Sequence, residues 1–429
     1  MSLSQRDKKH LWHPLTQHKN AGDLLPIAKA QGAVLWDDAG NQYIDAISSW
    51  YVSVYGHCNP LITSRIAEQM LQMDQIVFSG FTHRPAVELS EKLMAILPDN
   101  QQKIFFSDNG STSVEVAIKM ALQYYFNQDQ RRDTLIAFEE GFHGDTFGAM
   151  SVSGLSVYNG PFEDFSLNVL RIPTPDGRNN QAIFSQVKEI CEQHKVAGFV
   201  YEPLVQGAAA MKMYDANGLN ALLELFKEID VLTIADEVMT GFGKTGRYFA
   251  SDWIPAKPDI ICLSKALTAG MIPMGLTSCS QKIFDAFYDD SLTKGFFHGH
   301  TYSANPLACA AAIAGIELLT SNQIQDKIAW IIESHKAFNA KIKEHTLVKS
   351  TRQSGVIYAI DLAIEMDRYG GKRDKIFKFF MDRGVFLRPL GNTIYILPPY
   401  VISQLELDKV YQTIEACLLL LSGDDFLSQ

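Results

Sequence analysis

A lysine and an aspartate, each at the end of an apolar run, are the residues of this sequence best suited to chemistry. Lys265 follows the run 259–263, and Asp236 follows the run 231–235. A desolvated lysine has a lowered pKa and a nucleophilic amine that can form a Schiff base with an aldehyde. An aspartate on a nearby strand end keeps a pyridine nitrogen protonated, as pyridoxal 5′-phosphate requires. Taken singly, Lys265 is explained better as a surface lysine and Asp236 better as a capping residue than as parts of a site. The two residues together with the motifs described below predict a site for this cofactor.

A second pattern, SDNGSTS at 107–113, could hold a phosphate. Gly110 and Ser111 lie where the strand-like run 103–107 gives way to the helix-period segment 113–125. Free N–H groups and the helix dipole favour an anion there, and glycine permits a close backbone approach. The same residues also suit an ordinary helix N-cap. No Walker lysine follows, so a nucleoside triphosphate is not indicated.

Strand-like apolar runs alternate with helix-period segments from about residue 60 to 320. This alternation predicts an α/β fold with a mostly parallel sheet that has helices on both faces. In such folds ligands bind beyond the carboxyl ends of the strands, where Lys265, Asp236 and Gly110 lie. The predicted strands are 103–107, 134–138, 196–201, 231–235 and 259–263.

The rest of the chain predicts a smaller α/β domain. Residues 33–45 read as a hairpin with its turn at 38–41. A helix from residue 306 to about 319 leads to helix-period segments and short strands. We expect 1–52 to join this smaller domain, 53–320 to form the large cofactor-binding domain and 321–429 to form the smaller domain. The C-terminal segments are 328–345, 374–382 and 403–421 (helices) and 356–360 and 393–397 (strands).

Composition excludes several classes of protein. The chain has 429 residues, is 47% hydrophobic and carries a net charge of −10 without a Lys/Arg run, so we expect neither nucleic acid nor membrane as a partner. The N-terminus has no apolar signal core, which predicts a cytoplasmic protein. The six cysteines include no CxxC pair, which argues against a disulfide framework or a zinc site, and we expect no metal.

Taken together, the motifs resemble those of the class III, fold-type I pyridoxal-phosphate aminotransferases. The matching strings are DNGSTSVEVA (108–117), GFHGDT (141–146), EP (202–203), ADEVMTGFGKTG (235–246), SKA (264–266) and HTYSANPLA (300–308). The resemblance implies a homodimer with shared active sites and a role for each matching residue. Lys265 would form the Schiff base and shuttle protons, and Asp236 would pair with the ring nitrogen.

The resemblance also assigns the surroundings of the cofactor. Gly110 and Ser111 would bind the phosphate, and Phe142 would stack on the ring. His300 and Thr301 would also contact the cofactor, with Thr301 reaching the phosphate in the neighbouring subunit. The implied substrate contacts are Trp50, Phe142, Lys265, Gly299, Arg388 and Tyr395. Phe142 and Trp50 could otherwise be core aromatics, Arg388 could be a surface ion-pair residue, and His143 and His298 suit hydrogen bonding better than metal binding.

A further set of strings is similar to the biotin-pathway branch of this family. It implies transfer of an amino group to 8-amino-7-oxononanoate, which gives 7,8-diaminononanoate, with S-adenosylmethionine as the donor. Leu15 and Phe142 stand where this branch commonly has tyrosines, and Tyr51 where a second tryptophan is familiar, so lysine stays open as the donor. The strings are WHP (12–14), SSW (48–50), HCNP (57–60), GFTH (80–83), HGDTFGAM (143–150), FHG (297–299), RPLG (388–391), Tyr395 and PPY (398–400).

Three other functions fit parts of the sequence. Another class III ω-aminotransferase, acting on ornithine, 4-aminobutyrate or a diamine, would share Lys265 and Asp236; Trp50, Arg388 and Tyr395 argue against it. A non-catalytic binding module would have no need of both Lys265 and Asp236. A nicotinamide dehydrogenase is disfavoured because no GxGxxG follows a strand.

Overall fold

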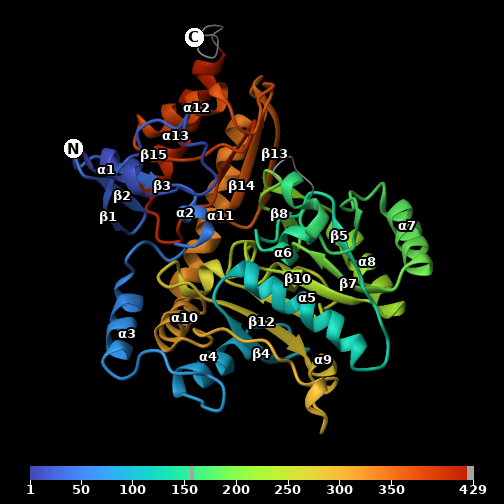
Figure 1. Cartoon of the computed structure of the whole chain (residues 1–429). Coiled ribbons are helices and arrows are strands. Elements are labelled where there is room, and N and C mark those ends of the chain that lie inside the picture. Colours follow the sequence, from blue (N-terminus) through green and yellow to red (C-terminus); the bar gives the residue numbers. More distant parts are fainter. Residues whose placement is uncertain (155–158, 423–429) are drawn as a thin grey trace.

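A seven-stranded sheet forms the centre of the computed structural model, which describes residues 1–154 and 159–422 (Figure 1). Neighbouring strands run parallel except β12, which is antiparallel to both β11 and β4. The predicted mostly parallel sheet is therefore confirmed. In spatial order its strands are β4 (Gln101–Ser107), β12 (Gly275–Ser280), β11 (Ile260–Leu263), β10 (Leu232–Asp236), β7 (Val196–Tyr201), β5 (Thr134–Phe138) and β6 (Val169–Ile172).

Helices cover both faces of this sheet. In β5, Leu135 and Ala137 pack in one core cluster with α5 (Gly110–Phe126), whereas Ile136 and Phe138 pack in another with α8 (Ala216–Glu228). Successive side chains of a strand point to opposite faces, so the sheet is the middle layer of three. Burial on both faces explains why the strands read as continuous apolar runs. The other helices of this part are α3 (Pro60–Met70), α4 (Arg84–Met94), α6 (Phe147–Val152), α7 (Asn180–Gln193), α9 (Gln281–Asp285) and α10 (Pro306–Leu319).

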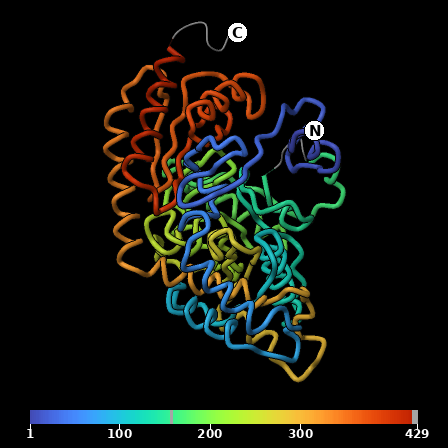
Figure 2. Tube along the Cα trace, turned by 90° about the vertical axis from the view of Figure 1, so that its left-hand side faces the viewer, coloured from blue at the N-terminus to red at the C-terminus, as the bar shows by residue number. Residues whose placement is uncertain are grey.

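Both ends of the chain build the smaller part of the molecule. The N-terminal hairpin is confirmed, and β3 (Gln42–Asp45) also pairs in parallel with β15 (Val385–Phe386). N-terminal and C-terminal segments therefore lie side by side, as both views show (Figures 1 and 2). The remaining elements are α1 (Leu3–His10), β1 (Ile27–Gln31), β2 (Val34–Asp37), α2 (Ser48–Tyr51), α11 (Asn322–Ile342), β13 (Val348–Ser354), β14 (Ile357–Leu362), α12 (Gly371–Met381), β16 (Thr393–Ile396) and α13 (Gln404–Leu421), with the short β8 (Val205–Gln206) and β9 (Lys212–Met213).

The structure differs from the sequence-based expectations in detail. Helix α11 begins six residues before the predicted start at 328, because Ser321 caps it through the N–H of Ile324. Strand β12 was not predicted, since its sequence GLTSCS has no continuous apolar run. Among the described residues no single helix is long and apolar enough to cross a bilayer; α10 and α11 pass that test only as a pair bent by 65°.

The core of the smaller part contains a buried histidine, His335. Its Nε2 donates to the carbonyl oxygen of Val356 at 3.1 Å, and its Nδ1 accepts from the hydroxyl of Tyr411 at 2.7 Å. The ring is therefore neutral and fully paired. Burial lowers the pKa of His335 to about 4.

This histidine predicts a loss of stability in mild acid. An unfolded histidine has a pKa of about 6.5, so between about pH 6.5 and 4 the unfolded chain binds a proton that the folded chain does not. The free energy of unfolding therefore falls as the pH falls through this window, by about 2 kcal/mol at pH 5 from this group alone. We expect His335→Gln to be less stable than wild type at pH 7 and to lose less melting temperature between pH 7 and pH 5. The exposed His10→Gln should show the same fall in melting temperature between pH 7 and pH 5 as wild type. If His335→Gln also showed the same fall as wild type, His335 would not be the cause of the loss of stability in acid.

Candidate active site

The carboxyl edge of the central sheet brings the main predicted residues together. Asp236 ends β10, and its register partner on the neighbouring strand β11 is Cys262, three residues before Lys265. Gly110 opens α5 just after β4, and Phe142 follows β5. The sheet thus places residues from four separated segments at one edge.

Lys265 is held in an unusual backbone conformation inside the protein. It opens the 3₁₀ turn Lys265–Thr268 with φ +46°, a region that costs a non-glycine residue about 1–2 kcal/mol. Desolvation lowers the pKa of its amine, although the carboxylates of Asp236 and Glu202 oppose that shift. The Nζ atom lies 5.1 Å from the ring centroid of Tyr51. This environment favours the neutral, nucleophilic amine.

Asp236 is fixed by two hydrogen bonds. Its Oδ2 accepts from Nδ1 of the buried His143 at 2.7 Å, and its Oδ1 accepts from the N–H of Val238 at 3.0 Å. The side chain is 3% exposed, so its charge acts with little screening by water. A carboxylate held in this way can serve as the fixed anion beside a protonated ring nitrogen.

Glu202 supports the same site from β7. Its Oε1 accepts from the N–H of Phe142 at 3.0 Å, and its Oε2 accepts from the N–H of Gly207 at 2.9 Å. Burial raises the pKa of Glu202 to about 7, against the opposing effect of His143. Glu202 therefore fixes the backbone that carries Phe142, a residue that remains 44% exposed.

The N-terminus of α5 provides an anion cradle. Asn109 caps the helix through the N–H of Thr112 at 3.0 Å, while in the described chain the N–H groups of Gly110 and Ser111 have no acceptor. Ser111 Oγ lies 2.7 Å from Thr146 Oγ1. A Cβ on Gly110 would come within 2.8 Å of a Val238 methyl, so glycine lets the helix end approach β10.

The substrate side is lined by aromatic residues and one arginine. The guanidinium of Arg388 lies 5.2 Å from the ring centroid of Trp50, and the Tyr51 hydroxyl donates to the Tyr395 hydroxyl at 3.3 Å. Desolvation, with help from the nearby Arg373, lowers the pKa of Arg388. Among the described residues Arg388 forms no ion pair, so a bidentate donor is available for a carboxylate ligand.

Trp50 and Tyr51 belong to a left-handed turn, α2. Ser48, Ser49, Trp50 and Tyr51 have φ values of 49°, 46°, 61° and 74°. Such a run of non-glycine residues is costly, about 1–2 kcal/mol for each residue, and persists only where neighbouring contacts hold it. Tyr51 was not among the predicted site residues, and its sequence position gave no signal of this turn.

Three predicted residues lie in an exposed segment near the loop before α5. Gly299, His300 and Thr301 are exposed, and a Cβ on Gly299 would meet no atom within 4 Å. His300 Nε2 lies 3.4 Å from Asp108 Oδ2, which ties this segment to the loop before α5. The contact predicted for Thr301 joins two subunits, and the contacts of all three residues stay predictions.

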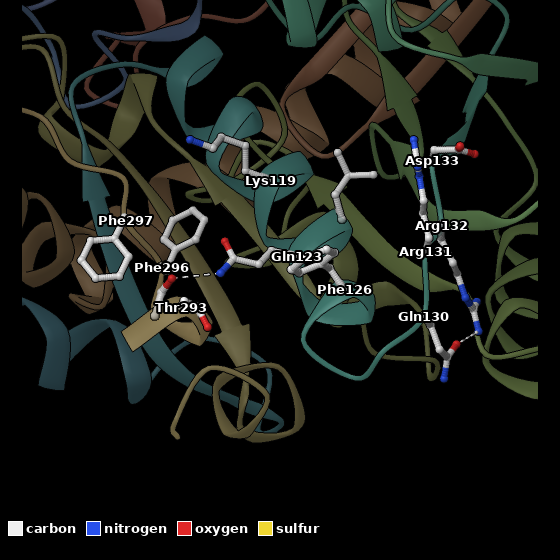
Figure 3. Close-up of a pocket in the computed structure, with 12 residues that line it drawn as sticks. Lys119, Gln123, Phe126, Gln130, Arg131, Arg132, Asp133, Thr293, Phe296 and Phe297 are labelled. Carbon is white, nitrogen blue, oxygen red and sulfur yellow. Dashed lines mark hydrogen bonds between the residues drawn. The ribbon is translucent and has the colours of Figure 1, made fainter. Parts of the chain in front are cut away.

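A surface groove of about 560 Å³ runs beside α5 and contains none of the predicted site residues. Figure 3 shows Phe296 and Phe297 on one side of Gln123, with Arg131 and Arg132 on the other. Gln123 donates to the carbonyl oxygen of Gly295 at 2.9 Å, and Arg132 pairs with Asp230 at 2.8 Å. The polar groups are therefore largely engaged with the protein itself. Within residues 1–154 and 159–422, no group of three or more His, Cys, Asp or Glu side chains could hold a metal ion.

The residues at the sheet edge fit pyridoxal 5′-phosphate. Two free N–H groups at a helix end suit its phosphate, the anion of Asp236 suits its ring nitrogen, and the desolvated amine of Lys265 suits its aldehyde. Fold and site together define a pyridoxal-phosphate enzyme of fold type I. The aminotransferase class-III family matches residues 16–418, and the chain belongs to this family.

Three of the similar proteins share one name. The adenosylmethionine-8-amino-7-oxononanoate aminotransferase of Synechococcus elongatus is 42% identical over 417 residues, which cover 94% of this chain and 97% of the relative. The Staphylococcus aureus enzyme of that name is 34% identical, with 94% of each chain covered. A crystal structure of the Methanocaldococcus jannaschii enzyme of that name has a TM-score of 0.90 and 32% identity, covering 96% of this chain and 98% of that one.

Proposed function

We propose that this protein transfers an amino group to 8-amino-7-oxononanoate, giving 7,8-diaminononanoate for biotin biosynthesis, with S-adenosylmethionine as the donor. The observation that carries the proposal is the pairing of Lys265 and Asp236 on adjacent strand ends, beside the arginine and aromatic residues of the substrate side. The shared name of relatives that match nearly the whole chain supports the substrate and the donor.

The bound cofactor would supply an aldehyde and an electron-withdrawing ring that stabilises negative charge at the substrate carbon. Asp236, which is oriented by His143, would place its negative charge beside the ring nitrogen of the bound cofactor. Lys265, whose amine pKa is lowered by desolvation, would accept a proton from the substrate carbon and deliver it to the carbon that was the cofactor aldehyde. Glu202 positions the backbone of Phe142, and Phe142, Trp50 and Tyr51 would line the substrate side of the site.

Arg388 is proposed to hold the carboxylate of the keto acid. Arg388→Ala should raise the KM for 8-amino-7-oxononanoate about 30- to 100-fold, the scale of a lost charged hydrogen bond, with bound-cofactor absorbance unchanged. Arg388→Lys keeps the charge but lacks the fork, so its KM should lie between the two. Steady-state kinetics with each substrate varied in turn would measure this. An unchanged KM for the keto acid would exclude the role.

The donor is the finer part of the proposal. Leu15 stands at a position where tyrosine is common in this branch, and it is 64% exposed with φ +50°. A leucine side chain has no polar atom, so it cannot form a polar contact with a substrate. Phe142 has no hydroxyl either. Both features weaken the contacts expected for S-adenosylmethionine and leave lysine as the donor to be tested.

We further propose a cytoplasmic homodimer with shared active sites. The segment 288–302, which includes the predicted contacts His300 and Thr301, exposes large apolar side chains, with Phe297 79% and Leu292 81% exposed. Exposed apolar side chains gathered in one segment are typical of an interface with another chain. Light scattering of the purified protein should give twice the mass of one chain.

A half-reaction titration tests the function. The absorbance of the cofactor-loaded protein is recorded, and S-adenosylmethionine or lysine is added alone. Conversion of the band by S-adenosylmethionine, reversed by 8-amino-7-oxononanoate, is the expected result. Conversion by lysine alone would reassign the donor. Conversion only by ornithine or 4-aminobutyrate would favour a general ω-aminotransferase and overturn the proposal.

A further inference from the structure

The left-handed turn Ser48–Tyr51 is anchored by one buried carboxylate, that of Asp45. Asp45 Oδ2 accepts from Ser49 Oγ and from His57 Nε2, both at 2.8 Å, and Oδ1 accepts from the N–H of Ile47 at 3.2 Å. The Asp45 side chain is fully buried. The carboxylate therefore binds the residue before the turn, a residue within it and a histidine that follows it.

The anchor itself is fixed to a sheet. Asp45 is the last residue of β3, its N–H donates to the carbonyl oxygen of Ala33 at 2.8 Å, and it pairs in parallel with Phe386 of β15. Ser48 Oγ donates to the carbonyl oxygen of Leu397 at 2.8 Å, which adds a second support from the C-terminal part. Both supports join the turn to the sheets of the smaller part.

The turn is the element that carries Trp50 and Tyr51 to the site. Trp50 meets Arg388, and Tyr51 meets Tyr395 and lies over Lys265. The sequence of the turn contains no glycine, so its backbone has no intrinsic preference for positive φ. External hydrogen bonds must hold it.

We infer that Asp45, acting through Ser49 and His57, is a positioning residue that holds Trp50 and Tyr51 in place for substrate recognition. The inference rests on the proposed function in one respect, namely that these two aromatic side chains face the substrate. According to this inference, the residues that face the substrate are held in place by a carboxylate that does not itself take part in the reaction.

Amide exchange and kinetics on the cofactor-loaded protein test the role of Asp45. In Asp45→Ala and in the milder Ser49→Ala, the N–H groups of Val52 and Ser53, which donate to the carbonyl oxygen of Ser48 at 2.9 and 3.0 Å, should exchange faster. For Asp45→Ala we expect the exchange rate and the KM for the keto acid each to increase about tenfold or more. The absorbance of the bound cofactor should be retained. Asp37→Ala is the matched control, because Asp37 is also buried but holds the hairpin turn through Asn41 and Tyr43.

A glycine rescue separates positioning from general damage. Glycine adopts positive φ without a side-chain penalty, so Ser49→Gly in the Asp45→Ala background should recover a large part of the lost KM, whereas Ser49→Ala in that background should not. The inference would be overturned if Asp45→Ala and Ser49→Ala had the same exchange rates and KM as wild type. It would also be overturned if Asp37→Ala changed these two quantities as much as Asp45→Ala does. If wild type fails to use the keto acid, the proposed function fails, while the exchange rates of the turn still decide whether Asp45 holds it.

Discussion

Lys265→Ala should reduce turnover by about 10⁴-fold or more, to a rate indistinguishable from background. The amine follows β11 beside Asp236 at the end of β10, and we propose that it is also the group that carries the proton. Its half-buried position and positive φ would be costly for a lysine without such a role. Removing it should abolish both half-reactions, with either donor.

Two further variants make this experiment specific. Lys265→Arg keeps a cation in place but has no amine that can lose its proton, so it should be as inactive as the alanine variant. The exposed Lys336→Ala should keep the wild-type rate. Single-turnover absorbance with each donor would measure all three proteins. Substantial residual turnover in Lys265→Ala would exclude the mechanism.

Much of this site could be predicted because its residues follow local rules. Asp236 and Lys265 each follow a buried apolar strand, and parallel strands bring their carboxyl ends to one edge. Gly110 likewise lies at a strand-to-helix junction that any reading of the apolar pattern can locate. The position of these residues along the strands is sufficient to predict that they lie together.

The substrate side could not be assembled in this way, because its contacts join distant segments. Tyr51 and Tyr395 meet across 344 residues, and Ser48 bonds to Leu397 across 349. No local pattern encodes the left-handed turn, since Ser-Ser-Trp-Tyr lacks the glycine that usually marks positive φ. The resemblance named Trp50 and Tyr395, but the anchoring role of Asp45 is visible only in the structure.

Strand β12 and the surface segment show two other limits. Strand β12 is fully buried but carries Ser and Thr. Thr277 Oγ1 donates to the carbonyl oxygen of Ser113 at 2.8 Å, whereas the hydroxyls of Ser278 and Ser280 are buried without a hydrogen-bond partner in the described part of the chain. A pattern of apolar residues cannot detect such a strand. The proposed contact of Thr301 joins two chains, and neither the sequence nor the fold of one chain can place it.

Asp236→Asn should lower the rate by about 10³-fold or more, while the protein still binds its cofactor. The single amide oxygen can still accept a hydrogen bond from His143, but the bond from the N–H of Val238 and the fixed negative charge are lost. A protonated ring nitrogen is then no longer favoured, and negative charge at the substrate carbon is stabilised less well. The same change should lower the pKa of Lys265 further, because Asp236 opposes the desolvation of that amine.

Glu202→Gln is the matched comparison, because Glu202 is equally buried, at 3% exposed, and lies at the end of the neighbouring strand β7. Its role is to hold the backbone N–H groups of Phe142 and Gly207, which a glutamine oxygen can do in part, so we expect a loss of about tenfold. Stopped-flow absorbance of the donor half-reaction would compare the two variants at equal cofactor occupancy. A near-normal rate in Asp236→Asn, or an equal loss in Glu202→Gln, would mean that the charge at the end of β10 does not act on the ring.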